Sequence, residues 1–168
     1  MGEKTIRILG DPVLREVAKP ITEINGQLQS LIEDMAETMY KAKGLGLAAN
    51  QIGETKRLFV LDLGQRENKP QLLVFINPEI IEAEGDLYEE EGCLSIPGYS
   101  TKIHRKAKIL VRALDREGKE FERELEGLGA RAIQHEIDHL NGILYIDYLS
   151  TLKKALFKKW WKKHGPRK

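Results

Sequence analysis

Two histidines near the end of the sequence have the spacing of a metal-binding pair. Residues 135–139 read His-Glu-Ile-Asp-His, which has the form His-Glu-x-x-His. On a helix, positions four apart lie on one face, so the imidazoles of His135 and His139 can reach a single ion. Glu136 can accept a proton from water held by that ion. The pattern predicts a hydrolytic metal site; the alternative is a surface helix that happens to carry two histidines.

A catalytic metal site of this kind needs a third protein ligand and an open position. In ordinary zincin endopeptidases the third ligand, a glutamate or histidine, follows the motif. Here no glutamate follows Glu136, and the only later histidine is His164, within a basic tail. Asp147 is a possible ligand, but it would leave the single cysteine of the chain unexplained. The third ligand is therefore better sought upstream.

That single cysteine is the best upstream candidate. Cys93 follows an acidic run and lies between Gly92 and a Pro-Gly turn, which indicates a partly open loop. The alternative is a buried and inert thiol, the commoner fate of a lone cysteine. His104 competes as a ligand, but its neighbours Arg105 and Lys106 disfavour a nearby cation. We therefore expect Cys93 to complete the site.

Apolar periodicity and turn residues predict the elements that position these groups. Asn25 is a plausible N-cap for the first helix, Gly142 closes the metal helix, and Asn77-Pro78 should end the second strand. We expect a single α+β domain over residues 1–168, with antiparallel or mixed sheets around a central His-Glu-x-x-His helix. The expected elements are an N-terminal helix over 25–43, strands over 57–63 and 72–76, a hairpin of 109–114 and 120–125, the metal helix over 127–141, and a C-terminal helix.

Bulk composition excludes several classes of protein. The chain has 168 residues, 41% hydrophobic and 32% charged, as in an ordinary globular protein. One cysteine excludes an internal disulfide and suits a reducing compartment. No signal peptide or run of about 18 apolar residues is present, so we expect a cytoplasmic protein without a membrane span.

Charge is distributed unevenly along the chain. Residues 150–168 hold eight lysines or arginines and no acid, whereas the other 149 residues hold 19 bases and 26 acids. Leu149, Leu152, Leu156 and Trp160 are spaced as a helical stripe that can dock on the body of the protein. A basic tail on an acidic body predicts a polyanionic partner; the alternative is a solvated helix.

Three segments, in order along the chain, carry a family resemblance. Together they resemble the three motifs of the bacterial peptide deformylases, and the resemblance covers nearly the whole chain. Asn50 departs from the family, which commonly has proline there, although the glutamine that follows is retained. The segments are Gly44-Leu45-Gly46-Leu47-Ala48-Ala49-Asn50-Gln51, Glu91-Gly92-Cys93-Leu94-Ser95 and Gln134-His135-Glu136-x-x-His139.

This resemblance implies an enzyme that removes the N-formyl group from the first methionine of a nascent polypeptide and releases formate. Glu136 would act as general base and then acid, and the Gln51 side chain and the Leu94 backbone N–H would stabilise the oxyanion. One divalent ion is expected, physiologically Fe²⁺, with Zn²⁺, Ni²⁺ or Co²⁺ also able to occupy the site. The implied ligands are Cys93, His135 and His139.

The resemblance also implies residues that bind substrate and support the site. Gly46 would offer its backbone to an extended peptide, and Leu45, Leu128 and Ala132 would form part of the methionine pocket; ordinary core packing is the alternative for these three. Glu91 and Arg105 would form a buried charge pair that steadies the cysteine loop, whereas the sequence by itself favours solvent exposure for both. Asp138 could orient a ligand histidine.

The implied partners are the formylmethionyl nascent peptide and the ribosome, which the basic C-terminal helix would contact near the peptide exit; no DNA partner is expected. Two other functions compete with deformylation. A zincin endopeptidase would need the missing downstream ligand. A nucleic-acid-binding domain with a structural zinc site would need a fourth ligand and would have no use for Glu136.

Overall fold

The computed structural model describes residues 2–166, without the side chain of residue 66. Arg167 and Lys168, the last two bases of the predicted basic tail, lie outside the described residues. The described residues form three α-helices, seven strands and four 3-10 helices. In order they are η1 (Pro12–Arg15), α1 (Gly26–Lys41), β1 (Gly46–Ala48), η2 (Ala49–Ile52), β2 (Leu58–Leu61), η3 (Gly64–Glu67), β3 (Leu73–Glu84), β4 (Leu87–Cys93), β5 (Ile96–Arg105), β6 (Lys108–Leu114), β7 (Glu120–Glu126), α2 (Gly127–Leu140), η4 (Tyr145–Tyr148) and α3 (Thr151–His164).

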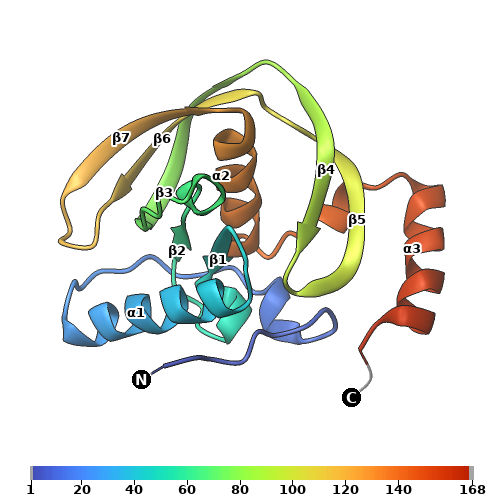
Figure 1. Ribbon diagram of the computed structural model, residues 1–168, viewed down its shortest axis with the longest axis horizontal. Helices are drawn as coiled ribbons and strands as arrows, with labels where there is room; N and C mark the ends of the chain where they lie inside the picture. Colours follow the sequence, from blue (N-terminus) through green and yellow to red (C-terminus); the bar gives the residue numbers. More distant parts are fainter. Residues whose placement is uncertain (1, 167–168) are drawn as a thin grey trace.

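Two antiparallel sheets flank the helix that carries the two histidines (Figure 1). The larger has five strands in the order β1-β2-β3-β6-β7, and the smaller is the β4-β5 hairpin. Every pair of neighbouring strands is antiparallel, and the parallel pairing described is an isolated bridge between Lys19 and Lys56. The structure therefore confirms the α+β class, with antiparallel rather than mixed sheets.

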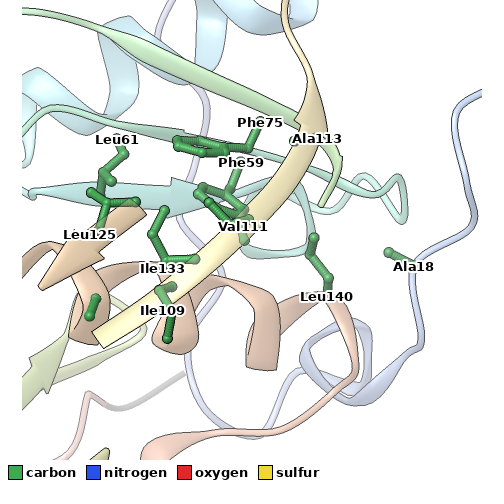
Figure 2. Close-up of a cluster of buried hydrophobic side chains, with 12 residues drawn as sticks. Ala18, Phe59, Leu61, Phe75, Ile109, Val111, Ala113, Leu125, Ile133 and Leu140 are labelled. Carbon is green, nitrogen blue, oxygen red and sulfur yellow. The ribbon is translucent and has the colours of Figure 1, made fainter. Parts of the chain in front are cut away.

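A core of aliphatic and aromatic side chains fixes α2 against the larger sheet. Phe59 on β2 and Phe75 on β3 are paired in register, and their rings stack at 4.8 Å. Ile133 and Leu140 on α2 are fully buried in the same cluster, which Figure 2 shows. Burial of this face of α2 leaves its other face free to present polar side chains toward the β4-β5 hairpin.

The first helix begins where the sequence predicted. The Asn25 side chain accepts a hydrogen bond from the Leu28 backbone N–H at 2.9 Å, which confirms the N-cap. Met35 and Met39 are fully buried with Ile32 in a second cluster against β2, so the methionines belong to the core. The helix ends at Lys41, two residues before the predicted end.

The prediction that Asn77-Pro78 ends the second long strand was wrong, because β3 continues to Glu84. A register shift between Ile76 and Glu79 absorbs the proline, which cannot donate to the sheet. Asn77 adopts a left-handed φ of 51°. Its side chain bonds both backbone groups of Ile21, at 2.8 and 2.9 Å, and these bonds stabilise the bulge.

The expected docking stripe of the C-terminal helix was wrong at two of its four positions. Leu152 and Leu156 are 69% and 57% exposed. Leu149 is buried and Trp160 packs as expected, but Phe157 takes the place of the two leucines. The rings of Phe157 and Trp160 lie 4.6 and 5.2 Å from the ring of Tyr99 on β5. Four-residue spacing therefore identified the two ends of the stripe, but between them the aromatic ring of Phe157 is buried and the two leucines are exposed.

Candidate metal centre

Three potential metal ligands from two separate elements meet at one point. Cys93 ends β4, while His135 and His139 lie one turn apart on α2. Nε2 of His139 lies 3.4 Å from the Cys93 Sγ and 3.2 Å from Nε2 of His135. The three donor atoms lie within 4.8 Å of one another, so a single ion can contact all of them.

The competing ligands considered from the sequence lie in other environments. His104 faces Asp86 on the exposed side of the hairpin, at 3.2 Å. Asp147 pairs with Arg15 at 2.7 Å, and His164 lies 3.2 Å from the Trp160 carbonyl oxygen on α3. None of the three belongs to the described cluster of Cys93 and the two α2 histidines.

The end of the β4-β5 hairpin gives Cys93 its position. The register shifts between Glu91 and Cys93, and Cys93 then pairs with Ile96 across a two-residue turn. Ile96 is fully buried and anchors the turn in the cluster beneath α3. The cysteine is half-buried at a strand end. The sequence correctly predicted a partly accessible thiol, but it predicted a loop where the chain forms a hairpin.

Glu136 lies in the interior of the protein beside these ligands. It is 5% exposed, and among residues 2–166 its Oε1 has no hydrogen-bond partner. Burial raises its pKa to about 7. A Cβ atom added at Gly46 would lie 2.7 Å from Glu136 Oε2, so only glycine allows β1 to pass this close. The carboxylate therefore has a free acceptor and a pKa suited to exchanging protons near neutral pH.

The Gln51 side chain points toward the cysteine from η2. Its Oε1 accepts a hydrogen bond from the Ala48 N–H at 3.0 Å, which fixes the orientation of the amide. Its Nε2 then donates to Ser95 Oγ at 3.0 Å and lies 3.6 Å from the Cys93 Sγ. Ser95, which sequence reasoning did not single out, is fully buried and holds the amide at the site.

Asn50, where the deformylase family commonly has proline, ties this segment to the N-terminal part of the chain. The residue is fully buried, and its Nδ2 donates to the Glu16 carbonyl oxygen at 2.9 Å. All four residues of η2 are buried. A side-chain hydrogen bond thus restrains the backbone here, where proline would restrain it through its ring.

A buried network of charges supports one of the histidines. Glu91 Oε1 lies 3.0 Å from His135 Nδ1, and the Glu91 carboxylate receives two hydrogen bonds from Arg105, at 2.8 and 2.9 Å. Arg105 also donates to Asp138 at 2.7 Å, and Tyr148 donates to the same carboxylate at 2.8 Å. Both Glu91 and Arg105 are buried, as the resemblance implied and as the sequence by itself did not.

This network corrects the expectation for Asp138 and keeps the Glu91 carboxylate ionised. Asp138 contacts Arg105 and Tyr148 rather than a ligand histidine, so it reaches His135 only through Arg105 and Glu91. Burial disfavours the Glu91 carboxylate, but the hydrogen bonds from Arg105 and His135 outweigh it and lower its pKa to about 2. Tyr148 carries no sequence signal that would have identified it as part of the site.

The negative charge of Glu91 should contribute to the free energy of unfolding. We expect Glu91→Gln to lower the free energy of unfolding at pH 7 by roughly 3 kcal/mol, because it leaves Arg105 less compensated in the interior. Since the folded-state pKa lies below the ordinary 4.5, the stabilisation is present above pH 4.5 and is lost as the pH falls toward 2. Urea unfolding with chelator present, from pH 7 to pH 3, measures this. The exposed Glu117→Gln is the control; a difference between Glu91→Gln and the parent chain that is constant with pH would contradict the assignment.

A cavity of about 700 Å³ opens beside the ligands. Gly44 to Gly46 of the first motif form one wall, the hairpin from Glu90 to Ser100 a second, and one face of α2 a third. The structure therefore brings together the residues expected to bind substrate, which are Leu45, Gly46, Leu128 and Ala132. Arg131, Tyr99 and Ser100 also line the cavity and were not predicted to do so.

The donor atoms suit a divalent cation. Glu91 occupies Nδ1 of His135 and so leaves Nε2 facing the other ligands, the usual arrangement of a metal-binding histidine. Burial lowers the pKa of His139, which keeps the ring in the neutral form that binds metals. Burial also lowers the pKa of His135, but hydrogen bonds with Cys93 and Glu91 raise it to about 10, so an ion would displace a proton there.

A helix carrying His-Glu-x-x-His, an upstream cysteine and a cavity open at the ligands define a metal-dependent hydrolase. The family model described as Polypeptide deformylase matches residues 3–155. A peptide deformylase from Thermodesulfovibrio yellowstonii is 57% identical over 152 residues, which cover 90% of this chain and 92% of the relative. One from Mesorhizobium japonicum is 52% identical over 164 residues, which cover 97% of this chain and 93% of the relative.

Solved structures agree with these relatives. A peptide deformylase from Legionella pneumophila superposes with a TM-score of 0.91 at 46% identity, covering 96% of this chain and 95% of that one. The enzyme from Thermus thermophilus gives 0.88 at 44% identity, covering 96% and 94%. The chain belongs to the peptide deformylase family, whose members use a metal ion to remove the N-formyl group from nascent polypeptides. Within residues 2–166, no helix is long and apolar enough to cross a membrane.

Proposed function

We propose that Cys93, His135 and His139 hold the metal ion of this deformylase and that Glu136 transfers the proton. The observation that carries the proposal is the buried Glu136 Oε1, which has no hydrogen-bond partner within residues 2–166 and lies beside three converging donor atoms. A divalent ion bound there supplies Lewis acidity and lowers the pKa of water toward neutrality. Glu136 accepts a proton from the water molecule that attacks the formyl carbon, and it then returns this proton to the departing amine.

The developing oxyanion requires hydrogen-bond donors that are fixed before the reaction. We propose the Gln51 side-chain amide and the Leu94 backbone N–H for this role. Support comes from the orientation of Gln51, whose Oε1 is held by Ala48 so that Nε2 faces the Cys93 turn. Leu94 lies in that turn, next to Cys93, and lines the cavity. Fixed donors cost no reorganisation during the reaction, and removal of one typically lowers kcat roughly 10²–10³-fold.

The cavity can also explain recognition of the first methionine. We propose that Leu45, Leu128 and Ala132 contact its side chain and that the Gly46 backbone binds the peptide. Leu128 and Ala132 lie on the same face of α2 as His135 and Glu136, so an apolar pocket and the reacting carbonyl share one wall. Gly46 lines the same cavity next to α2, at a point where a side chain would collide with Glu136 and Leu61.

The proposed ion is Fe²⁺. One thiolate and two imidazoles accept Fe²⁺, Zn²⁺, Ni²⁺ and Co²⁺, so the ligands permit several ions, and the family resemblance favours iron. A thiolate donates charge to the ion and moderates its acidity, which makes the rate sensitive to the identity of the ion. Metal analysis of protein purified without oxygen should find about one iron per chain by this proposal.

Formate release from an N-formylmethionyl tripeptide tests the proposed function. Metal-replete protein, prepared without oxygen, should release formate stoichiometrically with the free amine and leave the internal peptide bonds intact. Cleavage of an internal bond would favour an endopeptidase instead. Absence of both products with a full complement of metal would contradict a catalytic role for this site.

We further propose that the full 168 residues act as one catalytic domain in the cytoplasm and contact the ribosome through α3. Support for ribosome contact is electrostatic: the six described lysines of α3 are all exposed, and no acidic residue lies on the helix. Phosphate contacts of this kind are strongly weakened by salt. The aromatic side of α3 faces the body of the protein and leaves the lysines available.

Neutralising lysines tests this contact better than deleting the tail. Deletion of residues 158–168 would remove Trp160, which packs on the cavity-lining Tyr99. We expect Lys159→Gln, Lys162→Gln and Lys163→Gln together to lower ribosome affinity roughly 10-fold or more at low salt, with kcat/KM on a free tripeptide unchanged. Cosedimentation at several salt concentrations measures the effect. The same change at the exposed body residues Lys56, Lys69 and Lys119 is the control, and equal cosedimentation of the two variants would contradict the proposal.

A further inference from the structure

One cation projects into the substrate cavity from the helix that carries the histidines. Arg131 lies one turn before His135 on α2 and lines the cavity with Leu128 and Ala132. Among the described residues that line this cavity, it is the only lysine or arginine. Neither the metal site nor the proposed methionine pocket uses it.

The Arg131 guanidinium is held in place but not neutralised. Its Nη2 donates to the Glu90 carbonyl oxygen, while its Nε is buried without a hydrogen-bond partner in the described part of the chain. No ion pair joins it to a carboxylate within residues 2–166. Because Nε is enclosed by protein, a carboxylate in the cavity would pair with the outer nitrogens of the guanidinium, where it would meet no competing ion pair.

The acidic residues around the cavity do not cancel this charge. Glu91 is already paired with Arg105, at 2.8 Å. Glu136 lies at the metal site, with one oxygen against Gly46. Glu90 is exposed and stands opposite Lys102 in the hairpin register. Arg131 therefore leaves a positive charge on the wall along which a peptide must run.

The distance along α2 indicates which part of a peptide would reach Arg131. His135 follows Arg131 by four positions, which corresponds to roughly 6 Å along the helix axis. An extended peptide covers roughly 6.6 Å in two residues. With the formyl carbonyl at the metal site, the residues that follow the first methionine lie within reach of a long arginine side chain.

We propose that Arg131 is a specificity-determining residue that favours substrates with aspartate or glutamate at one of the two positions after formylmethionine. The proposal rests on the deformylase function of this same cavity. A guanidinium with free donors can pair with a carboxylate through charge-assisted hydrogen bonds, which an amide of the same shape matches poorly. Nascent chains would then be processed at rates that depend on their second and third residues.

Isosteric peptides isolate the charge. The test compares formyl-Met-Asp-Ala-amide with formyl-Met-Asn-Ala-amide, and formyl-Met-Ala-Asp-amide with formyl-Met-Ala-Asn-amide; the terminal amide removes a carboxylate that could itself bind Arg131. At one position or both, kcat/KM of the native enzyme should be roughly 5-fold higher for aspartate than for asparagine. This effect lies between that expected for an exposed ion pair and that expected for a buried charged hydrogen bond. The preference should shrink at 1 M salt.

Substitutions at Arg131 separate charge recognition from structural support. Arg131→Gln should bring the Asp/Asn ratio close to 1, Arg131→Lys should retain part of it, and Arg131→Glu should favour a lysine-containing peptide. The exposed Arg123→Gln on β7, remote from the cavity lining, should leave the ratio unchanged. If Arg131 only supported the Glu90 backbone, its loss would slow all peptides equally and leave the ratio as in the native enzyme.

The outcomes distinguish a failure of the role of Arg131 from a failure of the proposed deformylase function. Formate release from all four peptides with a ratio near 1 at both positions would overturn the role of Arg131 and leave deformylation intact. An Asp/Asn ratio that survives in Arg131→Gln would overturn it as well. Release of formate from none of the peptides would overturn the proposed function itself.

Discussion

Replacement of Glu136 by alanine should lower kcat for formate release by roughly 10²–10⁴-fold, the usual contribution of a positioned general acid–base group. The residue is buried beside the three ligands and has one oxygen without a partner among the described residues. Glu91, which also lines the cavity, is paired with Arg105 at 2.8 Å and so is not free to replace it.

This loss should occur without loss of metal or fold. Glu136 is not one of the three clustered ligands, so the alanine variant should still bind about one ion per chain. Thermal stability should be equal or higher, because the variant removes a buried polar atom that has no hydrogen bond. The exposed Glu117→Ala serves as the control for the assay. A fully metallated Glu136→Ala enzyme with native kcat would contradict the proton-transfer role.

Replacement of Cys93 by alanine should remove the metal. Loss of a residue that merely supports a ligand typically lowers metal affinity roughly 10–100-fold, and loss of a ligand itself should exceed that. Two imidazoles from adjacent turns of one helix contact an ion from one side only. Cys93, at the end of β4, is the donor that approaches from another element. Formate release should fall in proportion to the metal content.

Metal titration with a chromophoric chelator measures this change, and His104→Ala is the matched control. His104 was the competing upstream ligand, but it faces Asp86 on the exposed side of the hairpin. Its alanine variant should keep native metal affinity and activity. Retention of native metal affinity in Cys93→Ala, with His104→Ala impaired, would reverse the assignment.

Local chemistry made the cluster of proposed metal ligands predictable from the sequence. His135 and His139 have a fixed geometric relation once a helix is assumed, and the absence of a downstream acid directed attention to Cys93. The N-cap at Asn25 and the turn at Gly142, whose φ is 73°, were predictable for the same reason, since each depends on its own residue type. Short-range rules therefore identified the elements around the site.

Contacts between distant segments were harder to predict. The hairpin that carries Cys93 was missed because most of β4 is acidic and exposed, so its residues lack the apolar alternation typical of a half-buried strand. The burial of Glu91 and Arg105 follows from their pairing across the hairpin and with α2, which charge alone does not indicate. Ser95 and Tyr148 act through hydrogen bonds to distant residues, and Arg131 reaches the cavity only because α2 lies against it.

X-ray absorption spectroscopy of the zinc-loaded enzyme tests the proposed ligands most directly. The proposed ligand set would give one sulfur at about 2.3 Å, two imidazole nitrogens at about 2.0–2.1 Å and one light atom from solvent. The sulfur should remain in Glu136→Ala and in His104→Ala, both of which should keep the metal. A native spectrum without sulfur, or with a further protein side chain closing the fourth position, would contradict the ligand set from which the catalytic roles of Glu136 and Gln51 are argued.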